Sequence, residues 1–169
     1  KLTEALGQQT VIDNRPGASG SIGMTAVAKS PPDGYTLLLG QTGPNSVNPS
    51  LYDKLPYDPV KDYQPITNFV TVPNVLVAHP SFPAKSIAEL VAYAKANPGK
   101  VSYASIGEGS SGHLAQILFD QMAGTRFIHV PYKGNTPMIA DLLGNNVDTA
   151  TLGPSTVISL VKAGKIRML

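Results

Sequence analysis

The chain has 169 residues, of which 42% are hydrophobic and 14% charged, and a net charge of +2, a composition that supports a folded core. Its basic residues are scattered, and no apolar run approaches the roughly 20 residues of a membrane helix, so neither nucleic-acid binding nor direct membrane insertion is expected. The absence of cysteine excludes disulfides and thiolate-bound metal.

The beginning of the chain is predicted to alternate between short helices and strands. Residues 1–7 resemble the last turns of a helix that stops at Gly7, and a strand over 10–13 and a helix over 24–29 follow. The continuous apolar run 35–39 has the length of a strand covered on both faces. Because the first helix lacks a start and the last residues look like an interrupted strand, we expect the chain to be truncated at both ends.

A small polar loop, residues 40–45, follows the predicted strand 35–39. Ligands of open α/β sheets sit outside the carboxyl ends of the strands, so Gln41, Thr42 and Asn45 are candidate ligand contacts. The proline-rich stretch that comes next is predicted to be an irregular crossing segment, with a bend and candidate hinge at Pro73.

From about residue 74 onward, helices and strands are predicted to alternate regularly. Ser86 and Glu89 form a capping box that opens a helix, which ends at Asn97-Pro98-Gly99. The later pattern predicts strands over 101–106, 127–130 and 147–152 and helices over 114–122, 136–143 and 157–163, the second of them capped and started by Thr136-Pro137. Strands separated by single helices predict an α/β fold with a parallel sheet and right-handed crossovers.

The loop between the strand 101–106 and the helix 114–122 is the candidate binding site. A bare loop that opens into a helix brings backbone N–H groups together at the positive end of the helix dipole, which attracts anions. We therefore predict a small-carboxylate site here, whose candidate residues are Ser105, Gly107, Gly109, Ser110, Ser111 and His113. Glu108 is expected to point to solvent.

The same loop also matches a dinucleotide fingerprint through Gly107, Gly109 and Gly112. A dinucleotide-binding Rossmann-type enzyme is therefore the alternative interpretation. Such sites usually place an acid about 20 residues later, where this chain has no acid and offers only Lys133.

Other chemistries have less support in the residues. G-x-S-x-G is absent around Ser110 and Ser111, so one of these serines is expected to cap the helix rather than to act as a nucleophile. The chain's three histidines form no H-x-x-x-H pair, so no metal site is expected. His79 and His129 are interpreted as structural, and for His113 a ligand contact and a hydrogen bond that braces the loop remain equally open.

Several short motifs run in order through nearly the whole chain. They are residues 14–18 (NRPGA), 32–37 (PDGYTL), 48–52 (NPSLY), 55–59 (LPYDP), 109–113 (GSSGH), 130–134 (VPYKG) and 162–165 (KAGK). With these motifs the chain resembles the periplasmic substrate-binding proteins of tripartite tricarboxylate transporters, the Bug family.

The resemblance implies a two-lobe α/β fold of the periplasmic-binding-protein type with parallel-rich sheets. Residues 1–73 would be a partial first lobe, without its first strand and C-terminal return, and residues 74–169 the second lobe. A small carboxylate would lie between the lobes with no cofactor and no catalysis. Lys133 and Gly134 would border this cleft. The family further implies a periplasmic location and delivery of the ligand to membrane subunits of the transporter. The full-length protein would be a monomer, whereas the fragment would bind weakly and could pair through exposed sheet edges.

Overall fold

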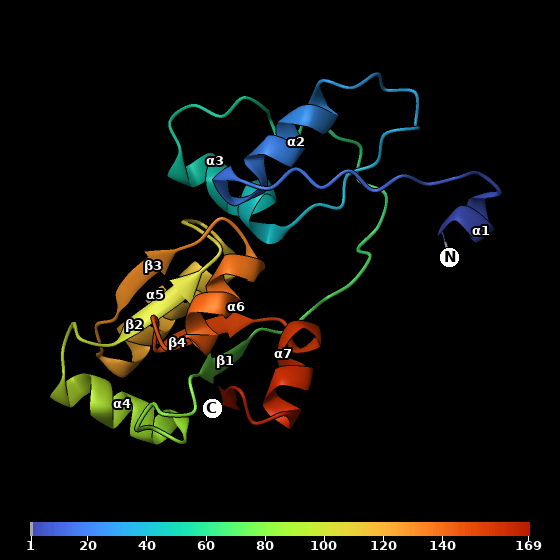
Figure 1. Ribbon diagram of the computed structural model, residues 1–169. Helices are drawn as coiled ribbons and strands as arrows, with labels where there is room; N and C mark the ends of the chain where they lie inside the picture. The colour runs from blue at the N-terminus through green and yellow to red at the C-terminus, as the bar shows by residue number, and fades with distance from the viewer. Residues whose placement is uncertain (1) are drawn as a thin grey trace.

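The computed structural model describes residues 2–169, so Lys1 of the expected first helix lies outside the described residues. Helix α1 spans Leu2–Leu6, and Gly7 follows it with a φ of 65°, as the predicted C-terminal stop requires. Figure 1 shows two parts: residues 2–74 lie above one end of a sheet that residues 75–169 build. No described helix is long and apolar enough to cross a membrane.

The N-terminal part is built from short helices and long connections. A 3₁₀ turn, η1 (Ala18–Gly20), leads into α2 (Ser21–Ala28), and a wide helical turn, η2 (Gly43–Val47), continues as α3 (Asn48–Leu51). The small polar loop expected over 40–45 is therefore helical from Gly43 onward. The buried apolar side chains described in this part are Met24, Pro44 and Tyr57.

The two strands predicted in this part, over 10–13 and 35–39, are wrong. Both segments lack strand structure, and most of their apolar side chains are exposed, to 84% at Val11 and 74% at Leu39. A strand exists through hydrogen bonds to a neighbouring strand, and no described segment pairs with either stretch. An apolar run of strand length is therefore not sufficient to form a strand.

The C-terminal part contains a five-stranded sheet in the order β3-β2-β4-β1-β5. Its strands are β1 (Val75–Ala78), β2 (Ser102–Ser105), β3 (Ile128–Pro131), β4 (Thr149–Leu152) and β5 (Arg167–Met168). The predicted parallel pairing is confirmed for β2 with β3 and for β2 with β4, but β1 runs antiparallel to both β4 and β5. The chain enters β1 from the N-terminal part, at the end of the sheet where β2–β4 finish, so β1 must run the opposite way (Figure 1).

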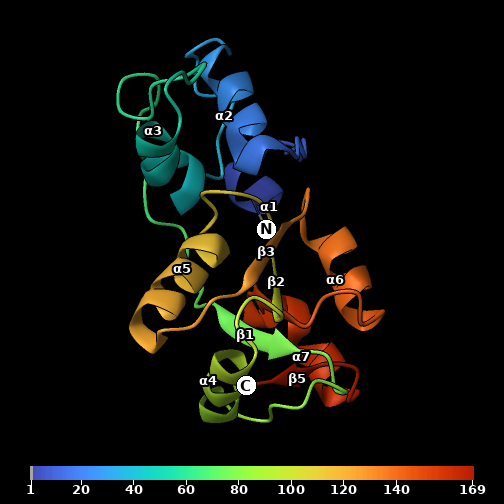
Figure 2. The same ribbon diagram turned by 90° about the vertical axis from the view of Figure 1, so that its left-hand side faces the viewer.

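Four helices cover the two faces of this sheet. Helices α4 (Ile87–Ala96) and α5 (Ser111–Ala123) lie on one side, and α6 (Asn135–Leu143) and α7 (Pro154–Lys162) on the other (Figure 2). Two buried clusters fill the layers, one of which includes Met138, Leu142 and Val157 and the other Leu90 and Ala94. The predicted α/β fold with a parallel-rich sheet is confirmed.

The structure confirms one predicted helix start and contradicts another. The capping box is confirmed, because the Ser86 hydroxyl accepts from the N–H of Glu89 at 3.3 Å and the Glu89 carboxylate accepts from the N–H of Lys85 at 2.7 Å. The predicted cap at Thr136 is wrong: α6 begins at Asn135, and Gly134 is its cap residue without a side-chain hydrogen bond. Gly134 has a φ of 126°, a conformation that favours glycine and turns the chain into the helix earlier.

Arg167 on β5 clamps the connection between β1 and α4. Its guanidinium donates to the carbonyls of Pro80 at 2.9 Å, Phe82 at 3.0 Å and Ala84 at 3.1 Å.

Arg167→Met is expected to lower the free energy of unfolding by about 2–3 kcal/mol, because charged donors are lost and part-buried carbonyls are left unpaired. Urea unfolding measures the loss. The exposed Arg126→Met is the control and should cost less than about 0.5 kcal/mol; an equally small loss for Arg167→Met would contradict the clamp.

Candidate functional site

The candidate site is the loop 106–110, which joins β2 to α5 at the carboxyl end of β2. In Figure 2 this loop lies directly beneath α2 and α3 of the N-terminal part. The loop that follows β3 lies beside it, because the N–H of Tyr132 donates to the carbonyl of Ser105 at 2.8 Å. The structure thus brings two loops of the sheet and the N-terminal part to one place, as ligand sites in open α/β sheets require.

Two glycines give the loop its shape. Gly107 and Gly109 have φ values of 119° and 73°, where residues with a side chain are strained. A Cβ on Gly109 would lie 2.9 Å from Leu51 Cδ2 and 3.0 Å from Asn48 Oδ1. Glycine at this position therefore allows the loop backbone to touch α3 directly.

Ser110 is the cap of α5, which confirms the prediction that one of the serines caps the helix. Its hydroxyl accepts from the N–H of His113 at 3.3 Å and donates to the carbonyl of Gly107 at 2.7 Å, and the residue is buried. The single hydroxyl proton is used within the loop. Ser110 therefore holds the loop in shape, whereas the exposed hydroxyl of Ser111 has no hydrogen-bond partner among the described residues.

The loop still offers backbone donors. Among the hydrogen bonds of residues 2–169, none involves the N–H groups of Glu108, Ser111 or Gly112. Ser111 and Gly112 form the first turn of α5, so their N–H groups also carry the positive end of its dipole. The arrangement can bind an anion through oriented dipoles without a buried cation. The Glu108 side chain is exposed, as expected.

Two histidines brace the loop from below. His113 Nδ1 accepts from the N–H of Gly109 at 3.2 Å, which identifies the loop-bracing hydrogen bond as one role of His113. His129 Nε2 lies 2.7 Å from the hydroxyl of buried Ser105, which also accepts from the N–H of Gly107 at 3.1 Å. Burial and then the neighbouring His113 lower the pKa of His129, while Glu108 raises it. Ser105 and both histidines thus fix the loop rather than present free donors.

The predicted contacts from the N-terminal part lie beside this loop. Gly43 touches it, since a Cβ there would lie 2.9 Å from the carbonyl oxygen of Gly109. Gln41 and Thr42 directly precede Gly43 and are exposed. Asn45 is also exposed, but its side-chain amide folds back toward Gly40, 2.6 Å from where a Cβ would stand.

Sequence reasoning missed a hydrogen bond that joins the two parts and a buried polar residue beside the loop. The Ser19 hydroxyl donates to the carbonyl of Glu108 at 2.6 Å, and Ser19 itself has a φ of 50°. Asn48 is fully buried and donates to Ser21 Oγ at 2.9 Å, while its own oxygen has no hydrogen-bond partner among the described residues. The glycines on both sides of Ala18-Ser19 were the sequence signal for a tight turn, but nothing in the sequence indicated its partner.

The remaining predicted residues border the site. Lys133 is exposed, and Gly134 follows it at the start of α6. The preceding Tyr132 carbonyl lies 3.9 Å from where a Cβ on Gly107 would stand, so this loop flanks the candidate site. The described residues contain no cluster of three or more histidine, cysteine or acidic side chains that could hold a metal.

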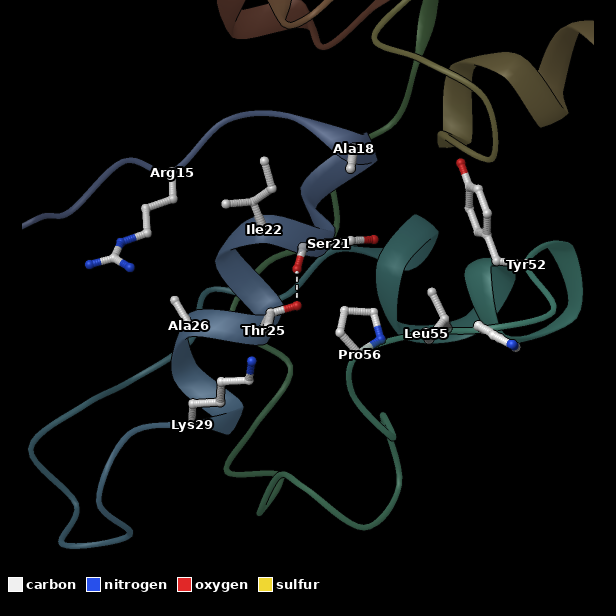
Figure 3. A pocket seen from close by; sticks show the side chains of 11 residues that line it. Arg15, Ala18, Ser21, Ile22, Thr25, Ala26, Lys29, Tyr52, Leu55 and Pro56 are labelled. Carbon is white, nitrogen blue, oxygen red and sulfur yellow. Dashed lines mark hydrogen bonds between the residues drawn. The ribbon is translucent and has the colours of Figure 1, made fainter.

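A cavity of about 460 Å³ lies elsewhere, between α2 and residues 52–56 (Figure 3). Its lining includes the cationic Arg15, Lys29 and Lys54 but no residue of the candidate loop. Arg15 extends away from α2 in Figure 3, and its Nε lies 2.7 Å from an Asp13 carboxylate oxygen. The loop and this cavity are thus separate features, the loop with unengaged backbone N–H groups and the cavity with cationic side chains.

Comparisons with known proteins bear on the whole chain. A family model described as "Tripartite tricarboxylate transporter family receptor" matches residues 1–169. A UPF0065 protein of Bordetella pertussis is 38% identical over 99% of this chain and 52% of its own length. Protein BugT of the same species is 40% identical over 99% of the chain and 52% of its own length. The chain thus spans about half the length of the curated relatives it matches.

Several solved structures are also similar to nearly the whole chain. A Rhodopseudomonas palustris protein, Rpa4515 with adipate, has a TM-score of 0.95 and 40% identity, covering 99% of this chain and 56% of that one. The periplasmic binding protein BugD has a TM-score of 0.91 and 36% identity over 99% of this chain and 56% of its own. MatC of R. palustris with bound malate has a TM-score of 0.88 and 29% identity, covering 99% of this chain and 57% of its own. None of these relatives favours the dinucleotide alternative.

Proposed function

Because the chain belongs to the tripartite tricarboxylate transporter receptor family, we propose that the whole protein is an extracytoplasmic solute-binding receptor. It captures a small carboxylate and hands it to the membrane subunits of its transporter, without catalysis and without a cofactor. Its place of action is the periplasm, in keeping with the periplasmic binding protein BugD that it resembles.

The observation that carries the proposal is the loop between β2 and α5, with the unengaged N–H groups of Glu108, Ser111 and Gly112. These donors bind one carboxylate group, and the hydroxyl of Ser111 adds a further hydrogen bond. The relatives solved with adipate and malate support a carboxylate as the ligand, since both carry this group. A site made of backbone dipoles neutralises the charge without requiring a particular side chain.

We assign residues 1–73 to one lobe and 74–169 to the other, with the ligand between them. Contacts between the parts support this division, because Ser19 and Gly43 meet the loop directly at Glu108 and Gly109. Gln41 and Thr42 face the ligand from the first lobe, and Asn45 joins them once its side chain turns away from Gly40. Lys133 and Gly134 lie at the border of the cleft on the second lobe. Closure brings the two sets of donors together.

Ligand-dependent thermal stabilisation tests the proposal. The full-length protein is heated with adipate, malate, citrate, glutamate or a nicotinamide dinucleotide, each in excess. A ligand at a hundred times its Kd should stabilise the protein by about 2.7 kcal/mol, because it binds only the folded state. We expect one carboxylate to raise the Tm by several degrees. Stabilisation by the dinucleotide, or by no carboxylate in a wide panel, would contradict the proposal.

A further inference from the structure

Two imidazole rings lie stacked beneath the candidate loop. The rings of His113 on α5 and His129 on β3 have centroids 4.1 Å apart and planes 13° from parallel. Each ring is hydrogen-bonded to the segment 105–109, His113 through Gly109 and His129 through Ser105. Histidine is the side chain whose charge normally changes near neutral pH, so the protonation of this pair and the shape of the loop are linked.

The hydrogen bond from Gly109 fixes the tautomer of His113. An N–H can donate to Nδ1 only if Nδ1 carries no proton, so the neutral ring holds its proton on Nε2. A second proton would have to enter at Nδ1. His113 would then be a donor at that atom, and the bond from the Gly109 N–H would break.

His129 constrains where a proton can go. Two cationic rings at this separation repel each other strongly, so the pair accepts one proton and not two. Burial, the largest cause, and the nearby His113 lower the pKa of His129. A proton on His129 Nε2 would also have to be shared with Ser105, which already holds Gly107. The ring of His129 thus positions the ring of His113 by stacking against it.

The other titratable groups beside the two histidines do not take their place in proton uptake. Tyr103 on β2 also stacks on His129, with ring centroids 6.0 Å apart, and burial raises the pKa of Tyr103 to about 12, so it stays neutral in the physiological range. Glu108 on the loop is exposed and attracts a proton toward the pair. Ser19, which reaches the loop from the N-terminal part, does not titrate.

We propose that carboxylate binding at this loop is coupled to the uptake of one proton by His113, with His129 as the positioning residue that holds the ring. Protonation at Nδ1 breaks the bond from the Gly109 N–H, which frees that donor, and adds a positive charge in the first turn of α5, where the proposed site lies. Affinity therefore rises as pH falls. This inference rests on the proposed carboxylate-binding function and deepens it.

Calorimetric titration of the full-length protein with adipate and malate tests the coupling. Titrations between about pH 8 and pH 6, in buffers of different ionisation enthalpy, count the protons taken up. We expect uptake approaching one proton and an affinity gain of up to about tenfold per pH unit, the limit for one linked proton. His113→Gln should abolish the uptake and flatten the pH profile. His129→Gln should keep binding but move the midpoint of the profile.

The third histidine supplies a matched control. His79 hydrogen-bonds to Ser81 at 2.7 Å and belongs to neither the pair nor the loop, so His79→Gln should leave the pH profile unchanged. Binding without proton uptake in the wild type, or the same uptake in His113→Gln, would overturn the inference while leaving the carboxylate receptor intact.

A measurement without ligand separates the two proposals further. In the ligand-free protein, the NMR signals of the His113 ring and of the Gly109 amide should move with one shared midpoint as pH is lowered. A Gly109 amide that ignores the titration of His113 overturns the coupling. If both carboxylates fail to bind, the proposed function and the coupling that rests on it both fail, even with this shared titration present, whereas binding of either without proton uptake overturns the coupling alone.

Discussion

Replacing both Ser110 and Ser111 with alanine is expected to weaken carboxylate binding about 10- to 100-fold. The two serines contribute differently. Ser111→Ala removes a free hydroxyl, and a hydrogen bond to a charged group is worth about 1.5–3 kcal/mol. Ser110→Ala removes the cap of α5 and the bond to the Gly107 carbonyl, which should cost about 1 kcal/mol of folding stability and loosen the loop. Calorimetry on the single and double variants separates these contributions.

Ser86 provides the matched control for the loss of a cap. It caps α4 with the same kind of hydrogen bond, accepting from the N–H of Glu89 at 3.3 Å, but α4 contributes nothing to the candidate loop. Ser86→Ala should therefore reduce stability by about 1 kcal/mol without changing affinity. Unchanged affinity in the Ser110/Ser111 double variant would remove the loop from the binding site.

Gly109→Ala is the second change with a large expected effect. The φ of 73° costs a residue with a side chain about 1–2 kcal/mol, and the added methyl would press on Leu51 and on the buried oxygen of Asn48. The loop must then move away from α3. We expect carboxylate affinity to fall more than tenfold, because the N–H groups of the loop are displaced from their present positions and the contact of Gly109 with α3 is lost.

Gly164→Ala is the control that separates the effect of backbone strain from the effect of the contact with α3. Gly164 has a φ of 66°, but a Cβ there would meet no atom within 4 Å. Gly164→Ala should therefore lose stability of a similar order from strain alone and keep full affinity. If the two alanine variants behave alike in calorimetry and in urea unfolding, the close approach of Gly109 to α3 has no role in binding.

Local patterns predicted the features that depend on neighbouring residues. The capping box at Ser86, a cap at one of Ser110 and Ser111, and the alternation of strands and helices after Pro73 each depend on residues only a few positions apart, and the structure confirms them. The candidate loop was found for the same reason. A strand, a glycine loop and a helix start are adjacent in sequence, so their joint geometry follows from the sequence order.

Features that depend on distant residues could not be predicted. The apolar run at residues 35–39 matched a buried strand, but strand formation needs a partner that the run itself does not specify. The bond from Ser19 to Glu108 joins residues 89 positions apart. His129 was interpreted as structural, and only the fold shows that its ring stacks on His113 and its Nε2 meets Ser105. The antiparallel direction of β1 was missed because it depends on where the chain enters the sheet.

The most direct test of the carboxylate site is chemical-shift mapping of the backbone amides. The full-length ¹⁵N-labelled protein is titrated with whichever carboxylate stabilises it best. Our account predicts that the largest shifts fall on the amides of Glu108, Ser111 and Gly112, with smaller ones at Gly43. Largest shifts at Ile22 and Thr25, which line the separate cavity beside α2, would contradict it.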